Sequence, residues 1–212
     1  MKRGIMLLAA LLLFAVLTAC GMGERKQVET LFAQAVQEYA ARESVELHLT
    51  VTNVLESGTF IQNDTMLWKH GENWLIQTSV PMGDDVRVIT QLQYGDLLFT
   101  EHNGEVTCRE QRLESIGQVK YEGFDTHERQ EDGSCVILLE RKATDTEQQK
   151  NIMRRAYTMT VNAGGDLVRL LTRDYNRNME YLEQELSILN WNSPVCAEKI
   201  EEAYTRLSES VK

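Results

Sequence analysis

The sequence predicts an α+β fold: a strongly curved antiparallel β-meander, or half-open barrel, with an N-terminal and a C-terminal helix packed at its concave face. Residues 24–42 carry a single apolar stripe with helical spacing. After them, apolar and polar residues alternate in about nine to eleven short runs joined by tight-turn sequences. A sheet of that many strands twists and curls. Its concave face is where the stripe of the first helix can be buried.

The first predicted element is the helix over residues 24–42. No Gly or Pro interrupts it, and its apolar residues recur at i, i+3, i+4, i+7, i+8 and i+11. They are Val28, Leu31, Phe32, Ala35, Val36 and Tyr39. Such a stripe requires an apolar surface to lie against.

The first strand follows, where the period changes to two. Val45, Leu47, Leu49 and Val51 alternate with polar residues, which indicates a half-buried strand. Similar runs cover residues 59–69, 73–80, 85–94, 97–102 and 105–112. Their connections are short and glycine-containing, and Asn103-Gly104 is a strong hairpin signal. Neighbouring strands therefore pair antiparallel.

The second half continues the meander. Residues 111–120 are ambiguous and fit a loop that crosses an edge, whereas 121–129 and 135–142 fit a hairpin. The spacing of Thr144 and Glu147 is that of a capping box, which predicts a short helix. A further hairpin (157–161 and 167–175) and a strand over 180–191 follow.

A helix closes the chain. Ser193 suits its N-cap and Pro194 its first position. Its apolar residues recur at i, i+4, i+7 and i+11, and they are Ile200, Tyr204, Leu207 and Val211.

The N-terminus reads as a secretory signal: Lys2 and Arg3 precede an apolar run that ends in Leu17-Thr18-Ala19-Cys20. These last residues resemble the lipobox of bacterial lipoproteins. The resemblance implies cleavage before Cys20, diacylation of its thiol and anchoring to a membrane by lipid. The 15 residues 5–19 fall short of the roughly 20 that a spanning helix needs. We therefore expect a signal peptide (1–19), a lipidated cysteine with a short tether (20–23) and one domain (24–212).

The tether places the domain close to the bilayer, because three residues reach only about 10 Å. The expected location is extracytoplasmic, on the outer leaflet of the plasma membrane if the envelope has one membrane. In an envelope with two membranes, Gly21 rather than Asp after the cysteine favours, by resemblance, the outer membrane.

The charge excludes one class of partner. Loss of Lys2 and Arg3 would take the formal net charge from −10 to −12. Such a surface is repelled by nucleic acid. We expect no nucleic-acid partner.

The reactive residues predict no catalytic site, no metal and no cofactor, and hence no enzyme. His48, His70, His102 and His127 are scattered, and no Cys or His falls at a metal-binding spacing. Besides Cys20, the thiols of Cys108, Cys135 and Cys196 leave two alternatives. Either Cys108 and Cys135 form a cross-strand disulfide, or all three are small buried hydrophobes.

Several features together resemble the LolA/LolB and LppX-type lipoprotein superfamily. They are the lipobox, the N-terminal helix, the meander with its hairpin Tyr157-Thr158-Met159-Thr160-Val161 … Gly165-Asp166-Leu167-Val168, and a final strand running into Asn190-Trp191-Asn192-Ser193-Pro194-Val195. The resemblance implies a half-barrel around an apolar cavity that holds acyl chains. Members shuttle lipids or lipoproteins, and others are sensors. The soluble shuttle lacks a lipid anchor, so the lipobox here favours a fixed receptor or handover role.

The resulting hypothesis is a membrane-anchored lipoprotein that binds a lipid or other apolar ligand. Its candidate cavity residues are Leu47, Leu49, Val51, Met66, Trp68, Trp74, Ile76, Val88, Leu92, Met159 and Trp191. The alternative is an envelope sensor or accessory module that binds an envelope protein and no small molecule. A concave face completely filled by the helices favours the alternative; an unfilled one favours a ligand.

Overall fold

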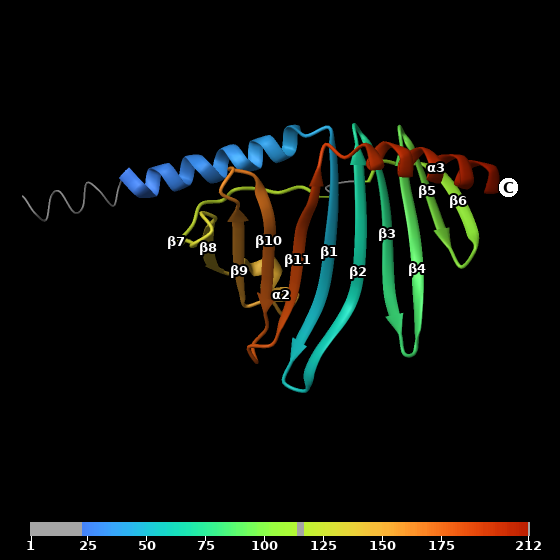
Figure 1. The fold of residues 1–212 in the computed structure, drawn as a ribbon. Helices are drawn as coiled ribbons and strands as arrows, with labels where there is room; N and C mark the ends of the chain where they lie inside the picture. Colours follow the sequence, from blue (N-terminus) through green and yellow to red (C-terminus); the bar gives the residue numbers. More distant parts are fainter. Residues whose placement is uncertain (1–22, 114–116, 212) are drawn as a thin grey trace, which may run out of the picture.

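Eleven antiparallel strands form one sheet in the computed structural model, which describes residues 23–113 and 117–211. The spatial order is β6-β5-β4-β3-β2-β1-β11-β10-β9-β8-β7 (Figure 1). The strands are β1 (Ser44–Leu55), β2 (Gly58–His70), β3 (Asn73–Met82), β4 (Asp85–Tyr94), β5 (Leu97–His102), β6 (Glu105–Glu110), β7 (Thr126–Arg129), β8 (Cys135–Lys142), β9 (Arg154–Val161), β10 (Leu167–Tyr175) and β11 (Tyr181–Trp191). The helices are the N-terminal helix (23–41), α2 (Asp145–Gln149) and α3 (Pro194–Ser210).

The sheet is not closed, because β6 and β7 are its two edges. The predicted α+β meander with its two long helices is therefore confirmed. One strand prediction is too long: of residues 121–129, only Thr126–Arg129 pair with β8. The residues before Thr126 belong to the connection between the two sheet edges.

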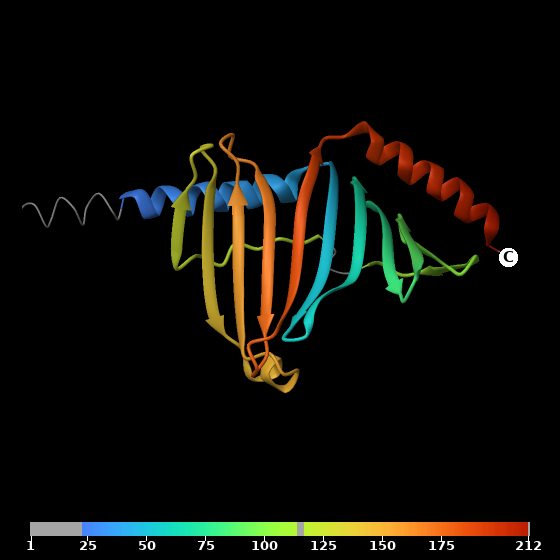
Figure 2. The same ribbon diagram turned by 60° about the horizontal axis from the view of Figure 1, so that its bottom comes forward.

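That connection, which we call the strap, runs from β6 to β7, and its residues 111–113 and 117–125 are described. Fifteen residues separate the two strands, and they reach about 50 Å when fully extended. The ten strand spacings between the edges add up to about 48 Å along the arc of the sheet. A route across the concave face is shorter than this arc and a route around the convex face is longer. The strap therefore crosses the concave face (Figure 2).

The first core lies on this concave face. Val28, Phe32, Ala35 and Tyr39 of the N-terminal helix are buried there, so the predicted stripe is confirmed. The helix lies across one end of the strands (Figure 1). Other members of this core are Val45, Leu47, Leu67, Ile76, Cys135, Ile137, Met159, Val161, Leu167 and Leu186, together with Val119 and Phe124 of the strap.

The second core lies on the opposite face, under α3. Leu67 belongs to the first core and its neighbour Trp68 to the second, and adjacent residues of a strand point to opposite faces. Ile200 and Leu207 of α3 pack there. The expectation that the C-terminal helix packs at the concave face is thus wrong. Helical spacing identifies the buried stripe but not the sheet face, and the strap and first helix already lie on the concave side.

The ends of α3 agree with the sequence in part. Pro194 stands in the first turn as predicted, and Ser193 takes the N-cap position without a side-chain hydrogen bond. Arg206 holds α3 to β5 through two hydrogen bonds to Glu101, of 2.7 and 2.8 Å.

The proposed disulfide between Cys108 and Cys135 is wrong. Cys108 lies on edge strand β6 against the second core, and Cys135 lies on β8, near the other edge, in the first core. Both thiols are free, as is the buried Cys196. The alternative of small buried hydrophobes holds for Cys135 and Cys196, while Cys108 is partly exposed.

Two predictions concern segments before residue 23. The signal peptide and Cys20 lie outside the described residues. Among residues 23–113 and 117–211, none of the helices combines the length and apolar character required to cross a bilayer.

Candidate ligand-binding site

Two cavities lie between the strap and the concave face of the sheet. Cavity 1, of about 560 Å³, is under the first half of the strap; cavity 2, of about 410 Å³, is over β8–β11. Gln118 and Lys120 of the strap line both. Each volume is within the usual range of small-molecule sites. The helices and strap therefore leave the concave face partly unfilled.

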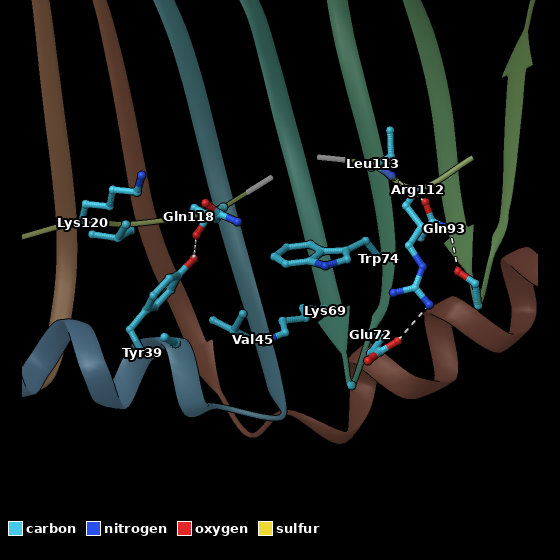
Figure 3. A pocket seen from close by; sticks show the side chains of 15 residues that line it. Tyr39, Val45, Lys69, Glu72, Trp74, Gln93, Arg112, Leu113, Gln118 and Lys120 are labelled. Carbon is cyan, nitrogen blue, oxygen red and sulfur yellow. Dashed lines mark hydrogen bonds and ion pairs between the residues drawn. The ribbon is translucent and has the colours of Figure 1, made fainter. Parts of the chain in front are cut away.

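Cavity 1 is built where the N-terminal helix ends over the sheet. Its wall includes Tyr39, Val45 of β1 and the neighbouring residues Lys69 of β2 and Trp74 of β3. Figure 3 shows the Trp74 indole between the strap and the end of the helix. The glycine turns between β2 and β3 and between β4 and β5, with Gln93, complete the wall.

Two buried polar side chains fix the strap over cavity 1. The Tyr39 hydroxyl donates a 2.6 Å hydrogen bond to the Gly117 carbonyl, and burial raises its pKa to about 12, so it remains a donor. Gln93, only 4% exposed, accepts from the Leu113 amide at 2.9 Å through Oε1. Its Nε2 donates to the carbonyls of Gly95 and Leu97 at 2.7 and 3.2 Å. Gln93 is thereby held in one orientation, which sets where the strap leaves the sheet edge.

The far end of the strap is fixed by Arg25 of the N-terminal helix. Its guanidinium donates a 2.6 Å hydrogen bond to the Phe124 carbonyl and lies 4.5 Å from the centroid of the Phe124 ring. The next residue, Asp125, donates its amide to the Leu138 carbonyl at 2.8 Å. By contrast, residues 118–123 make no hydrogen bond with the rest of the described chain. Apolar contacts of Val119 and Tyr121 hold this middle part.

Gly117 is a point where the strap lies close to the sheet and the N-terminal helix. It has φ +64, and an added Cβ would lie 2.9 Å from Trp74 Cη2 and 3.2 Å from the Tyr39 hydroxyl oxygen. Both its left-handed backbone and its close approach require glycine.

Cavity 2 has an apolar and a polar part. Ile137, Leu139, Met159 and Leu170 give it apolar walls from β8, β9 and β10. The polar part includes Arg155 and Asp174, Thr172 and Gln184, and Glu122 of the strap. An apolar chain would find matching surface on the first set.

An ionic network lies beside cavity 2 and fixes α2. Arg155 binds Asp174 through Nη2 and Oδ2 at 2.6 Å, and its Nη1 lies 2.8 Å from Glu147. Arg141 binds both carboxylate oxygens of Glu147 at 2.8 Å. The bonds from Arg141, followed by those from the Thr144 amide and hydroxyl, hold the pKa of Glu147 well below its usual range. The predicted capping box of Thr144 and Glu147 is confirmed.

The structure separates the predicted cavity residues into three groups. Trp74 lines cavity 1 and Met159 lines cavity 2. On the concave face without lining either cavity are Leu47, Leu49, Val51, Ile76 and Trp191. On the opposite face lie Met66, Trp68, Val88 and Leu92, and for these four the prediction is wrong.

The reason for this error is the parity of the strands. Trp68 and Leu92 have the apolar character of a cavity wall, but they alternate with Leu67 and Gln93, which face the concave side. Trp68 and Leu92 form the floor beneath α3. For the remaining seven residues, contact with a ligand stays a prediction.

The sequence analysis did not identify the polar residues of the site, and of the strap it predicted only a loop over residues 111–120. Gln93 is a polar residue in the buried part of β4, and Lys69 is a charged residue at the end of a largely apolar stretch of β2. The signal available for the strap was the absence of a clear period over residues 111–120. In the described part of the chain no cluster of three His, Cys, Asp or Glu side chains could hold a metal ion.

Comparison with solved structures identifies the fold. The lipoprotein LppX of Mycobacterium tuberculosis matches with a TM-score of 0.53 and 13% identity, covering 80% of this chain and 97% of that one. LprF from Mycobacterium bovis (TM-score 0.44, 14% identity, 80% and 94% covered) and a LolA superfamily protein from Nitrosomonas europaea (0.35, 11%, 78% and 94%) also match. No protein family model and no curated protein sequence matches the chain. The chain has the fold of LppX, as its sequence pattern indicated.

Gly117→Ala tests the close approach of the strap. The variant should lose about 1–2 kcal/mol for its left-handed backbone and a further 1–3 kcal/mol typical of overpacking. The matched control is Gly83→Ala, because Gly83 has φ +70 with open space around it and should show only the first loss. Urea unfolding of both variants measures the difference; equal losses would contradict the tight packing at Gly117.

Glu147→Gln tests the ionic network and its pH dependence. Because the folded-state pKa of Glu147 lies below its ordinary value of 4.5, its charge stabilises the fold above that value and the stabilisation is lost as the pH falls towards the folded-state pKa. The variant should therefore be less stable than the parent at pH 7, and the difference between their free energies of unfolding should be smaller at about pH 3. Urea unfolding at both pH values, with the exposed Glu128→Gln as control, checks this. A gap independent of pH would exclude the charge as its cause.

Proposed function

We propose that this chain is an extracytoplasmic lipoprotein that binds a lipid or other apolar ligand between the strap and the concave face of its sheet. The observation that carries the proposal is the partly unfilled concave face. A cavity of about 560 Å³ remains beside the end of the N-terminal helix and one of about 410 Å³ over β8–β11, and α3 packs on the other side of the sheet. If the helices had filled this face completely, binding of a protein partner without a small-molecule ligand would have been favoured instead.

The apolar lining and the strap suit a chain-like ligand. Apolar residues of cavity 2 come from three neighbouring strands, so an acyl chain could be desolvated along its length. The central strap residues 118–123, which lack hydrogen bonds to the rest of the described chain, can be displaced without breaking any such bond. A ligand could therefore enter beneath this part of the strap while its fixed ends stay in place.

Anchoring through Cys20 places this site at a membrane surface. The N-terminal helix is already formed at residue 23, so only residues 21 and 22 separate it from Cys20, and residue 23 can lie at most about 10 Å from the cysteine. Two acyl chains on the cysteine would give stable attachment, which a single chain does not. A domain held this way suits a fixed receptor or a handover protein that takes lipid from the adjacent leaflet. The proposed role is binding, without catalysis.

Native mass spectrometry of the domain from Gly21 onward, followed by solvent extraction, tests the proposal. Both cores lie within residues 23–211, so this part contains everything its folding requires. We expect a co-purifying acyl lipid, or binding of a fluorescent fatty acid to the delipidated domain. A clean apo mass without fatty-acid binding would refute the ligand-binding proposal.

Leu170→Trp should block cavity 2, because the larger ring would fill cavity space over the concave face of β9 and β10. We expect fatty-acid affinity to fall at least about tenfold, equivalent to about 1.4 kcal/mol; Leu139→Trp on β8 provides a second variant. Val88→Trp is the control, since Val88 is 51% exposed on the opposite face. Unchanged affinity in folded Leu170→Trp and Leu139→Trp, judged by circular dichroism, would place the ligand elsewhere.

Cys20→Ser in the full chain tests the anchor. The parent, expressed in a bacterial host and measured by intact mass, should lose residues 1–19 and carry a diacylglycerol group. The variant should show neither change, because serine offers no thiol for the modification. A parent that retains residues 1–19, or that lacks the lipid, would contradict anchoring.

The alternative function, an envelope sensor or accessory module, has one observation in its favour. Large apolar side chains are exposed on the β1–β2, β3–β4 and β10–β11 hairpins: Leu55, Phe60, Ile61, Met82, Val86, Val88 and Met179. Exposed apolar side chains often mark a contact site where they lie together. If the domain proves to be free of ligand, these hairpins are where a protein partner should be sought.

A further inference from the structure

We propose that cavity 1 holds the anionic head group of an amphiphilic ligand, and that Lys69 is the residue that contacts it. This inference rests on the proposed function, to which it adds the chemical class and the polarity of the ligand. The ligand would be a fatty acid or a phosphate-bearing lipid, which share a negative group at the end of an acyl chain.

The charges of the two cavities differ. Among the described residues, the wall of cavity 1 contains three cations, Lys69, Arg112 and Lys120, and one carboxylate, that of Glu72. The wall of cavity 2 contains two cations and two carboxylates. In a chain whose formal net charge is −10, cavity 1 is therefore a locally positive site.

Ion pairs within the protein neutralise only part of the positive charge of cavity 1. Arg112 lies 2.7 Å from Asp96 and 3.5 Å from Glu72, so it is neutralised by these carboxylates. Lys69 and Lys120 have no carboxylate within 4.0 Å among the described residues. Figure 3 shows Lys120 extending away from Trp74 and Lys69. Among the described residues, Lys69 is thus the cation without an ion-pair partner on the helix side of cavity 1.

The surroundings of Lys69 make an unpaired charge costly. It is half-buried and pairs across the sheet with Val45 on one side and Trp74 on the other. Burial lowers its pKa, because the charged ammonium loses hydration. Within the described part of the chain, its Nζ donates one hydrogen bond, to the Arg42 carbonyl at 2.9 Å, whereas an ammonium has three donors. An anionic group in the cavity could accept a remaining donor and supply the missing counter-charge.

The two cavities together match the two ends of an amphiphile. They share the strap residues Gln118 and Lys120, so they adjoin each other beneath the strap. A head group at Lys69 would leave its chain to follow the strap toward the apolar walls of cavity 2, made by Leu139, Met159 and Leu170.

Lys69 also has a structural role that must be separated from ligand binding. The Arg42 carbonyl that it contacts follows the last residue of the N-terminal helix, where a positive charge is favourable. Loss of this contact would lower stability in the same way for every ligand. A preference for anionic over neutral ligands, by contrast, requires the charge to act on the ligand itself.

The test compares ligands that have the same chain length but different head groups. The delipidated domain from Gly21 onward is titrated at pH 8, below micellar concentrations, with dodecanoate, dodecyl phosphate, dodecanol and dodecyltrimethylammonium. We expect at least one anion to bind tenfold or more tightly than dodecanol, with the cation weakest. The tighter of the two anions distinguishes a fatty acid from a phosphate head group.

Variants test whether Lys69 causes the preference for anionic ligands over dodecanol. In Lys69→Met, which keeps the apolar stem, the preference should fall to threefold or less; Lys69→Arg should retain it, as should the exposed control Lys26→Met. The inference is overturned if Lys69→Met keeps the preference for anionic ligands. It is also overturned if the parent binds the anions and dodecanol equally well. In both cases the proposed function stands. If none of the four probes binds, the proposed function fails as well.

Discussion

A covalent constraint shapes this molecule: fifteen residues must join the two edges of an eleven-stranded sheet. The joining segment is barely as long as the arc of the sheet, so it has to cross the concave face, and the sheet must stay curved for it to reach. Gly117 lets the strap approach Trp74 and Tyr39, and Gln93 fixes where it leaves the edge. The strap thereby covers the concave face and divides the remaining space into two cavities.

The two helices complete the arrangement by occupying opposite faces. The N-terminal helix covers one end of the concave face, and its Arg25 holds the far end of the strap. α3 buries Trp68, Leu92 and Phe99 on the other face. Each face of the sheet thus has its own apolar core. Because the concave face is covered by one helix and a single extended segment, space remains there that a third element would have filled.

The sequence predicted the helices and strands better than it predicted the face of the sheet on which each residue lies. Helical and alternating periods located the N-terminal helix, most strands and the Thr144–Glu147 capping box. Periodicity cannot say which face of a curved sheet is concave, so Trp68 and Leu92 were assigned to the wrong side. The strap has no period at all, and the significance of Lys69 and Gln93 depends on what crosses above them. Predicting the site required the long-range pairing of β1 with β11, which brings the two halves of the meander together.

The central claim is that an apolar ligand lies between the strap and the concave face. Photo-crosslinking of the domain with a fatty acid that carries a diazirine on its chain, followed by peptide mapping, tests it most directly. The account predicts labelled residues in the strap (117–123) and on β8, β9 and β10, at the walls of cavity 2. Labelling confined to the exposed apolar hairpin residues such as Val86 and Val88, or to α3, would contradict it.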